Sequence, residues 1–399
     1  MKIGNKKAIS NWNLPTESLL PRPKDSIADA GDIRGNADVI REVLAEFDIA
    51  AKVRETNVGP KVTSYVLKIK PPTPIQKVSA LEVNIALSLK AQAIRVEVMS
   101  EKRRLVTIEV PNLRSAVLPI SSMLSSAEWK KSVSQTSFII GKDVYGKVIT
   151  SDLGAGEHIL FAGQTGSGKS VLNNAILASL LSRNTPETLK LILVDPKQVE
   201  FAPYKDVPHL QMPVITSPKG YAEALNWLSE ESDRRTQLIA ASGADSIDEF
   251  NGISEIILPR VVVVCDEISD LMMNDARHVE TTVHAIANSP KDLGIHFILS
   301  TSRPSMDVVT ESLRSSMSTR WALTMASQVD SMTILEVPGA EKLLGQGDML
   351  LKSDTGETLQ RIQIAHIGDD DVSSIVAFWK NQAAERNYSS KDIIGDYRQ

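Results

Sequence analysis

Eight consecutive residues have the spacing of a phosphate-binding loop. Residues 163–170 read Gly-Gln-Thr-Gly-Ser-Gly-Lys-Ser, which matches the pattern G-x-x-x-x-G-K-[ST] without a gap. Glycines let the backbone curl so that successive N–H groups face phosphate oxygens, and the following helix adds its positive N-terminal end. We expect Lys169 to reach the β- and γ-phosphates of ATP and the Ser170 hydroxyl to bind Mg²⁺. The residues expected to bind the nucleotide are Gly163, Gln164, Thr165, Gly166, Ser167, Gly168, Lys169, Ser170 and Val171.

A pair of carboxylates follows an apolar segment farther along the chain. The run of four valines at 261–264 predicts a buried central strand, and Asp266 and Glu267 follow one residue later. Ligands bind at the C-terminal ends of strands in open parallel sheets. We therefore expect Asp266 to hold Mg²⁺ and Glu267 to polarise the attacking water. Together with the phosphate-binding loop, this pair predicts hydrolysis of ATP rather than binding alone.

Two further strand ends carry polar side chains whose roles the sequence leaves open. Asp195 and Lys197 follow an apolar segment and are either site residues or part of a solvated turn. Ser302 follows another such segment and is either a sensor of the γ-phosphate or part of an ordinary exit from a strand.

An α/β pattern surrounds these motifs. Short apolar, β-rich segments alternate with helical segments, which predicts a parallel central sheet covered by helices on both faces. The predicted strands are 159–162, 189–194, 261–265 and 297–300, and the predicted helices start at Lys169 or cover 221–241, 278–287 and 371–385.

A smaller α+β unit is predicted ahead of this region, and it contains no catalytic constellation. Its pattern gives helices near 39–47 and 78–92 and strands near 52–58, 62–69, 93–98 and 105–110. The predicted organisation is a linker or extended lead-in over 1–35, the small domain over 36–135, the ATPase domain over 136–385 and a polar tail over 386–399.

The composition excludes several classes of protein. The formal net charge of −5 gives no overall attraction to nucleic acid, although a local basic patch would suffice. The single cysteine, Cys265, excludes an internal disulfide, and the six histidines lack paired ligand spacing. The sequence has neither a run of about 18 apolar residues nor the apolar core of a secretory signal. We expect a cytoplasmic chain, either by itself or as the soluble part of a membrane-anchored protein.

In order along the chain, these motifs resemble the FtsK/SpoIIIE family of double-stranded DNA translocases. Blocks upstream of the phosphate-binding loop resemble the α domain of that family, and the resemblance extends from about Leu14 to about Lys380. The blocks that carry it are 59–60, 77–79, 84–87, 108–111, 141–143, 194–197 with Glu200, 207–210, 233–235, 270–273, 294–296, 303–305, 319–320 and 339–349.

The resemblance implies a RecA-like P-loop core and a homohexameric ring around duplex DNA, with each ATP site at a subunit interface. Contacts to the DNA backbone would be independent of sequence and sensitive to salt. The resemblance does not cover the membrane anchor or the C-terminal winged-helix module of the family, so orientation by DNA sequence is not expected from this chain.

Two positions near the expected ATP site depart from the family pattern. Lys291 stands where the family has an arginine that reaches into the neighbouring subunit, and lysine lacks the planar fork of donors. Such an arginine is worth about 10³–10⁵ in rate, and Arg303 and Arg320 are candidate substitutes. Ser302 stands where the family usually has glutamine, and its shorter side chain would need a bridging water to reach the γ-phosphate.

The expected DNA-binding positions are Arg314, Gln328 and Met332, and only Arg314 is basic. Arg314 is either a phosphate contact or part of a solvated helix face. Each missing phosphate contact lowers the salt slope by about 0.9, so we expect a weaker grip or a contribution from Lys342 and Lys352.

Three functional hypotheses follow from the sequence. The favoured one is an ATP-driven duplex DNA translocase acting in chromosome segregation or DNA transfer. The alternatives are a ring with a regulatory or assembly role and little turnover, and a secretion ATPase that moves protein. The match to the α domain disfavours the secretion ATPase.

Overall fold

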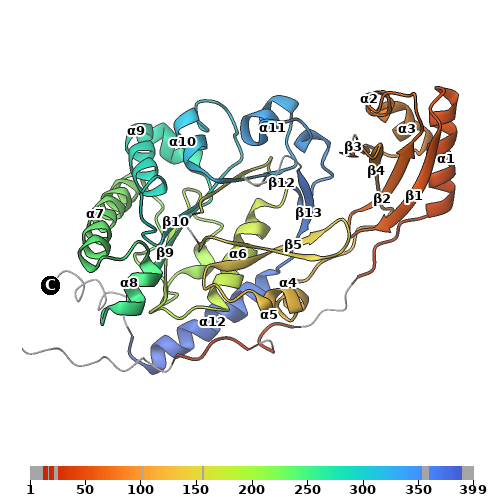
Figure 1. Cartoon of the computed structure of the whole chain (residues 1–399). Helices are drawn as coiled ribbons and strands as arrows, with labels where there is room; N and C mark the ends of the chain where they lie inside the picture. The colour runs from red at the N-terminus through yellow and green to blue at the C-terminus, as the bar shows by residue number, and fades with distance from the viewer. Residues whose placement is uncertain are drawn as a thin grey trace, which may run out of the picture.

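The computed structural model describes residues 12–16, 18–21, 26–100, 102–154, 157–352 and 359–388. They form a small domain and a large domain, each built around its own sheet (Figure 1). Within these described ranges, the model contains no helix that is both long and apolar enough to cross a membrane.

The small domain is a four-stranded antiparallel sheet with helices packed on one face. The strand order is β1-β2-β4-β3, and α1 lies against the sheet (Figure 1). The elements are α1 (Ile33–Glu46), β1 (Ala51–Val58), β2 (Val62–Ile69), α2 (Gln76–Ala80), α3 (Glu82–Ser88), β3 (Arg95–Ser100) and β4 (Leu105–Pro111).

The single helix predicted over 78–92 is two short helices in the structure. The backbone leaves the helical conformation at Leu81 (φ −93°, ψ 8°), and Lys90 adopts a left-handed φ of 54°. Val78, Leu81 and Ile85 are nevertheless all buried in the core of the small domain. The apolar spacing therefore continues across the break, which is why the pattern alone predicted one helix.

The two central strands of the small sheet, β2 and β4, are buried on both faces. Along β4, Val106 and Ile108 face the helices, whereas Thr107 and Glu109 face the other way and are only 5% and 3% exposed. Side chains alternate between the two faces of a strand. The large domain covers this second face.

The large domain is a nine-stranded mixed sheet with the order β6-β5-β13-β12-β11-β7-β10-β9-β8. The five strands from β11 to β8 are parallel, and four of them were predicted for the central sheet, whereas β11 was not. The four strands from β6 to β12 form an antiparallel extension that was not predicted. The strands are β5 (Ser137–Asp143), β6 (Val148–Asp152), β7 (Ile159–Ala162), β8 (Leu189–Val194), β9 (Arg260–Cys265), β10 (Ile295–Thr301), β11 (Thr319–Leu323), β12 (Asp348–Lys352) and β13 (Gln360–Ile364).

Helices cover both faces of this sheet. Along β9, Val262 and Val264 pack into one core and Val261 and Val263 into another. Helices α4, α5, α6 and α12 contribute to the first core, and α7 to α11 to the second (Figure 1). The helices are α4 (Ile120–Leu124), α5 (Ala127–Lys131), α6 (Lys169–Leu181), α7 (Pro218–Ser242), α8 (Ile247–Ile253), α9 (Ile268–Ala287), α10 (Glu311–Ser316), α11 (Gln328–Leu335) and α12 (Asp369–Glu385).

The N-terminal segment packs on the large domain before the chain enters the small one. Trp12 and Leu20 are buried in the large domain's first core, and the backbone of Asn13 exchanges two hydrogen bonds with Gln382 of α12. Figure 1 shows this red segment beside α12. The part of the predicted lead-in that the structure describes is therefore anchored on the large domain at Trp12, Asn13 and Leu20.

Two segments pair where the chain passes between the domains. Asp29 and Arg114 form an antiparallel bridge through two backbone hydrogen bonds, of 2.9 and 3.2 Å, and the Ser26 hydroxyl lies against Val117. Beyond this neck, Leu118 belongs to the large core. We propose that the division between domains falls after β4 rather than near residue 135.

Candidate active site

The phosphate-binding loop joins β7 to α6 in a conformation that requires glycine. Gly166 and Gly168 have left-handed φ values of 79° and 115°. A Cβ atom on Gly168 would lie 2.9 Å from the backbone nitrogen of Gly347. The loop is therefore a curled backbone at the N-terminus of a thirteen-residue helix, the arrangement that binds phosphate.

Lys169 and Ser167 have polar atoms available for an anion. The Lys169 ammonium donates to the carbonyl of Gly163 at 2.7 Å, and burial lowers its pKa although Glu267 and Asp266 act in the opposite direction. In the described part of the chain, the buried Ser167 hydroxyl has no hydrogen-bond partner. Both features fit a nucleotide phosphate, which would satisfy the hydroxyl and draw the ammonium away from the loop carbonyl.

Oxygen atoms suited to Mg²⁺ meet below this loop. The Ser170 hydroxyl donates to Glu200 at 2.5 Å, and Asn173 donates to the Asp266 carboxylate at 3.2 Å. Burial, followed by the charge of Glu200, raises the pKa of Asp266 to about 6. Mg²⁺ prefers one or two protein oxygens combined with phosphate and water. In the described residues, no three Asp, Glu, His or Cys side chains are grouped to hold a metal ion. A Mg²⁺ site of the kind expected here does not require such a group, because phosphate and water supply the remaining ligands.

Glu267 is surrounded by donors from its own chain. One carboxylate oxygen accepts from the hydroxyls of Thr301 (2.6 Å) and Ser269 (2.9 Å), and the other from the Ser302 hydroxyl (2.5 Å) and N–H (3.0 Å). Burial would raise the pKa of Glu267, but these hydrogen bonds outweigh it and lower the pKa. Ser302 is therefore in direct contact with the expected catalytic carboxylate.

The turn after β8 contributes to the same edge of the sheet. The Lys197 ammonium is 3.5 Å from the second Glu267 oxygen. Asp195 is fully buried and accepts from the N–H of Phe201 at 2.9 Å, so it holds the turn that carries Lys197 and Glu200. The structure thus assigns different tasks to the two residues whose roles the sequence left open.

Gly347 supports the phosphate-binding loop from the antiparallel half of the sheet. Its N–H donates to the Ser167 carbonyl at 2.7 Å, and its carbonyl accepts from Ile364 of β13 at 2.9 Å. Gly347 has a φ of 83°, and a Cβ atom there would lie 2.5 Å from the Ile364 side chain. Sequence reasoning found the block around Gly347 through a resemblance but did not find this contact.

Lys291 lies at the opposite edge of the sheet from this site. It precedes the N-terminal end of β10, whereas the phosphate-binding loop follows the C-terminal end of the parallel strand β7. Its ammonium donates to the Ala244 carbonyl (2.6 Å) and to Asp245 (2.8 Å). The geometry therefore separates Lys291 from Lys169 of its own chain.

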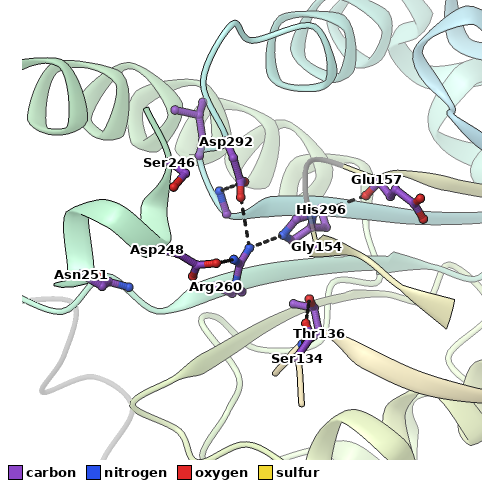
Figure 2. A network of polar contacts seen from close by, with 12 residues as sticks. Ser134, Thr136, Gly154, Glu157, Ser246, Asp248, Asn251, Arg260, Asp292 and His296 are labelled. Atoms are coloured by element: carbon purple, nitrogen blue, oxygen red, sulfur yellow. Dashed lines mark hydrogen bonds and ion pairs between the residues drawn. The ribbon is translucent and has the colours of Figure 1, made fainter. Parts of the chain in front are cut away.

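A polar network centred on the buried Arg260 fixes the backbone beside Lys291. Arg260 binds Asp248 at 2.8 Å and lies 3.5 Å from Asp292, and it contacts His296 at 3.2 Å (Figure 2). The Asp292 side chain also accepts from the N–H of Gly294 at 2.8 Å. The turn that carries Lys291 is therefore held at several points.

The candidate DNA-binding residues lie on α10 and α11. Gln328 is exposed at the start of α11, and Met332, one turn later, is 43% exposed. Arg314 on α10 is paired with Glu311 and lies 3.8 Å from Glu336.

Glu336 binds two of the four other cations that the sequence analysis named, Arg320 and Lys352. It accepts from Arg320 at 3.0 Å and from Lys352. Hydrogen bonds from these two residues lower the pKa of Glu336 to about 2. Lys342 is paired with Glu82 at 2.7 Å, and Arg303 with Asp307 at 3.1 Å.

Comparison with known proteins agrees with this arrangement. The model of the FtsK/SpoIIIE family matches residues 119–306, and that of the FtsK alpha domain matches residues 14–112. DNA translocase FtsK of Haemophilus influenzae is 36% identical over 92% of this chain and 75% of its own length. This chain belongs to the FtsK/SpoIIIE family.

Other members of the family are longer than this chain. DNA translocase FtsK of Clostridium tetani and DNA translocase SftA of Bacillus subtilis are each 38% identical, over 92% and 93% of the chain. The chain spans 50% and 40% of their lengths.

Solved structures share the fold. The pCW3 conjugation coupling protein TcpA, in its monomer form with ATPγS, has a TM-score of 0.59 at 23% identity over 86% of this chain and 99% of TcpA. The cytoplasmic domain of the Thermomonospora curvata type VII secretion ATPase EccC has a TM-score of 0.56 at 24% identity, over 66% of this chain and 34% of its own. The chain therefore has the P-loop ATPase fold of the family.

Proposed function

We propose that this chain is the motor region of an ATP-driven translocase of double-stranded DNA that works as a homohexameric ring. The observation that carries the proposal is the convergence of Lys169, Ser170, Asp266 and Glu267 at one edge of the parallel sheet. Membership of a family whose relatives are named DNA translocases supports duplex DNA as the substrate.

In this proposal each residue has one task in hydrolysis. Lys169 and the loop N–H groups bind the phosphates, and Ser170 and Asp266 hold Mg²⁺, which when bound neutralises charge on the phosphates. Glu267 orients and deprotonates the attacking water. Both of its oxygens are occupied by hydroxyl and N–H donors, so Glu267 must release at least one of them to accept from water.

Lys291 is proposed to act on the site of a neighbouring subunit. Its position at the far edge of the sheet fits a contact made between subunits. Asp245 is 88% exposed, so the pair that holds Lys291 lies at the surface and exchanges readily with another anion.

One observation favours a second function, a ring with a regulatory role and little turnover. The four donors to Glu267 lower its pKa and so weaken it as a base. In addition, the cations near the expected DNA contacts are already paired with carboxylates.

Hydrolysis of ATP by the purified chain, with and without long linear duplex DNA, separates the two functions. Strong stimulation by duplex DNA is expected, and Lys169→Ala and Glu267→Ala should abolish it. Turnover that ignores DNA would contradict the translocase and favour the regulatory ring.

Ser302→Ala tests the tasks given to Ser302 and Glu267 in the same assay. Removing the 2.5 Å hydrogen bond should raise the pKa of Glu267 and shift the acidic limb of the pH–rate profile upward. An unchanged pH–rate profile would show that Ser302 does not influence Glu267 during hydrolysis.

A further inference from the structure

The two domains meet at a buried cluster of charged side chains. Arg361 of β13 donates to both oxygens of Asp348 on β12, at 2.9 and 2.6 Å, and through its remaining terminal nitrogen to Glu109 of the small domain at 2.6 Å. These three side chains are at most 5% exposed. Arg95 lies 3.5 Å from the other Glu109 oxygen. Little water screens these charges, so their geometry is tightly constrained.

This cluster is continuous with the support of the phosphate-binding loop. Asp348 directly follows Gly347, whose N–H donates to the Ser167 carbonyl. One Asp348 oxygen also accepts from the N–H of Leu344 at 2.8 Å and so closes the turn from which Gly347 projects. A displacement of the Asp348 carboxylate therefore displaces the backbone that contacts the loop.

We propose that Glu109, a residue of the small domain, positions the phosphate-binding loop of the large domain. It acts through Arg361 and Asp348, which set the position of Gly347. Glu109 does not reach the nucleotide and is a positioning residue. The inference rests on nucleotide binding as proposed above and is independent of DNA translocation.

Glu109 differs from two neighbouring polar side chains on the same face of the small sheet. Ser64 lies opposite Glu109 in the sheet register, on the face that the large domain covers. In the described residues, its buried hydroxyl and that of Thr107 have no hydrogen-bond partner. Of these three side chains on the face, only Glu109 forms a hydrogen bond to the described part of the large domain.

One other ion pair joins the domains within the described ranges and provides a matched control. Lys342 and Glu82 are 2.7 Å apart, but their side chains are 41% and 19% exposed. In the described residues, neither side chain of this pair contacts Asp348 or Arg361, although Lys342 lies two residues before Leu344. Glu82→Gln therefore removes a contact between domains and leaves every hydrogen bond of Arg361 and Asp348 in place.

The test compares the affinity of the full chain for a fluorescent ADP analogue with Mg²⁺. Glu109→Gln should weaken binding about tenfold, within the usual range of coupling between sites, and Glu82→Gln should leave it unchanged. In ATP hydrolysis, Glu109→Gln should raise KM more than it lowers kcat. Wild-type affinity in a folded Glu109→Gln variant would overturn the inference.

A measurement on the wild-type chain covers the case in which Glu109→Gln does not fold. Coupling is reciprocal, so Mg²⁺–ADP should slow hydrogen exchange of the amides of β4 and leave β1, at the sheet edge, unchanged. No protection of β4 would overturn the inference. A wild-type chain that binds no nucleotide at all would instead contradict the proposed function.

Discussion

Asp266 is a carboxylate in an environment that disfavours its charge. Burial and the nearby Glu200 raise its pKa to about 6, against 3.8 for an ordinary aspartate. The folded protein therefore binds a proton between these pH values that the unfolded chain does not. Stability falls as the pH rises from about 4 to about 6 and is then constant, because the ionised carboxylate remains unfavourable at higher pH.

Asp266→Asn should therefore stabilise the chain while abolishing hydrolysis of ATP. At pH 7.5, without nucleotide and in EDTA, we expect a gain of about 1–3 kcal/mol, since one pKa unit corresponds to about 1.4 kcal/mol. Thermal unfolding from pH 4.5 to 8 measures it. The gain should shrink steadily below pH 6, and a gain independent of pH would contradict this account.

The sequence alone located the candidate site residues that lie in contiguous motifs. The phosphate-binding loop and the pair Asp266–Glu267 each follow an apolar strand, so their place at the edge of the sheet was predictable. The donors to Glu267 other than Ser302 were not found. Thr301 and Ser269 are ordinary hydroxyl residues in sequence, and only the sheet brings Thr301 to the carboxylate.

At the scale of elements, the end of α11 brings several cations together. Glu336 ends this helix with a left-handed φ of 62°, a conformation that usually selects glycine. Its carboxylate is shared by Arg320, Lys352 and, more distantly, Arg314. Three elements, α10, β11 and β12, thus place a cation around one anion, and a DNA phosphate would have to compete with that anion.

Glu336→Gln should strengthen binding of duplex DNA and steepen its dependence on salt. Each cation freed for a phosphate adds about 0.9 to the salt slope. Anisotropy titrations with labelled duplex at several salt concentrations measure both effects. Glu311→Gln serves as a graded comparison, because Glu311 is paired only with Arg314 among these cations and its removal should raise the salt slope by less. Equal salt slopes for Glu336→Gln and the wild-type chain would show that duplex DNA does not bind near Glu336.

The apolar pattern predicted four of the five parallel strands and missed β11 and the antiparallel strands. The four predicted strands are largely continuous apolar runs, because both faces of a parallel strand are buried. In β11 and β13, Arg320 and Arg361 interrupt the apolar residues, and Arg361 is buried in an ion pair with Asp348. An apolar run broken by a charged residue is too short to predict a strand from the sequence alone.

At the scale of the whole molecule, the N-terminal segment is part of the large core. Trp12 is 8% exposed, and its ring lies 5.8 Å from that of Trp379 and 5.2 Å from that of Tyr388. The segment was predicted as a linker because it is polar and contains several prolines. A single aromatic residue within such a stretch gives no periodic signal.

Trp12→Ala should destabilise the large domain by about 3 kcal/mol, the usual effect of truncating a buried tryptophan. The control is Leu14→Ala, because Leu14 is 43% exposed. Hydrogen exchange resolved by segment should show faster opening of α12 but not of α1. Equal loss in both domains would indicate that they unfold as one unit.

The paired neck has a mechanical consequence. Anchors on the large domain hold the small domain at both of its ends, at Leu20 and at Leu118, and Asp29 and Arg114 join the two connections. A pulling force on the small domain divides between two covalent paths. The hydrogen-bonded pair also resists torsion, so the small domain cannot swivel freely around the neck.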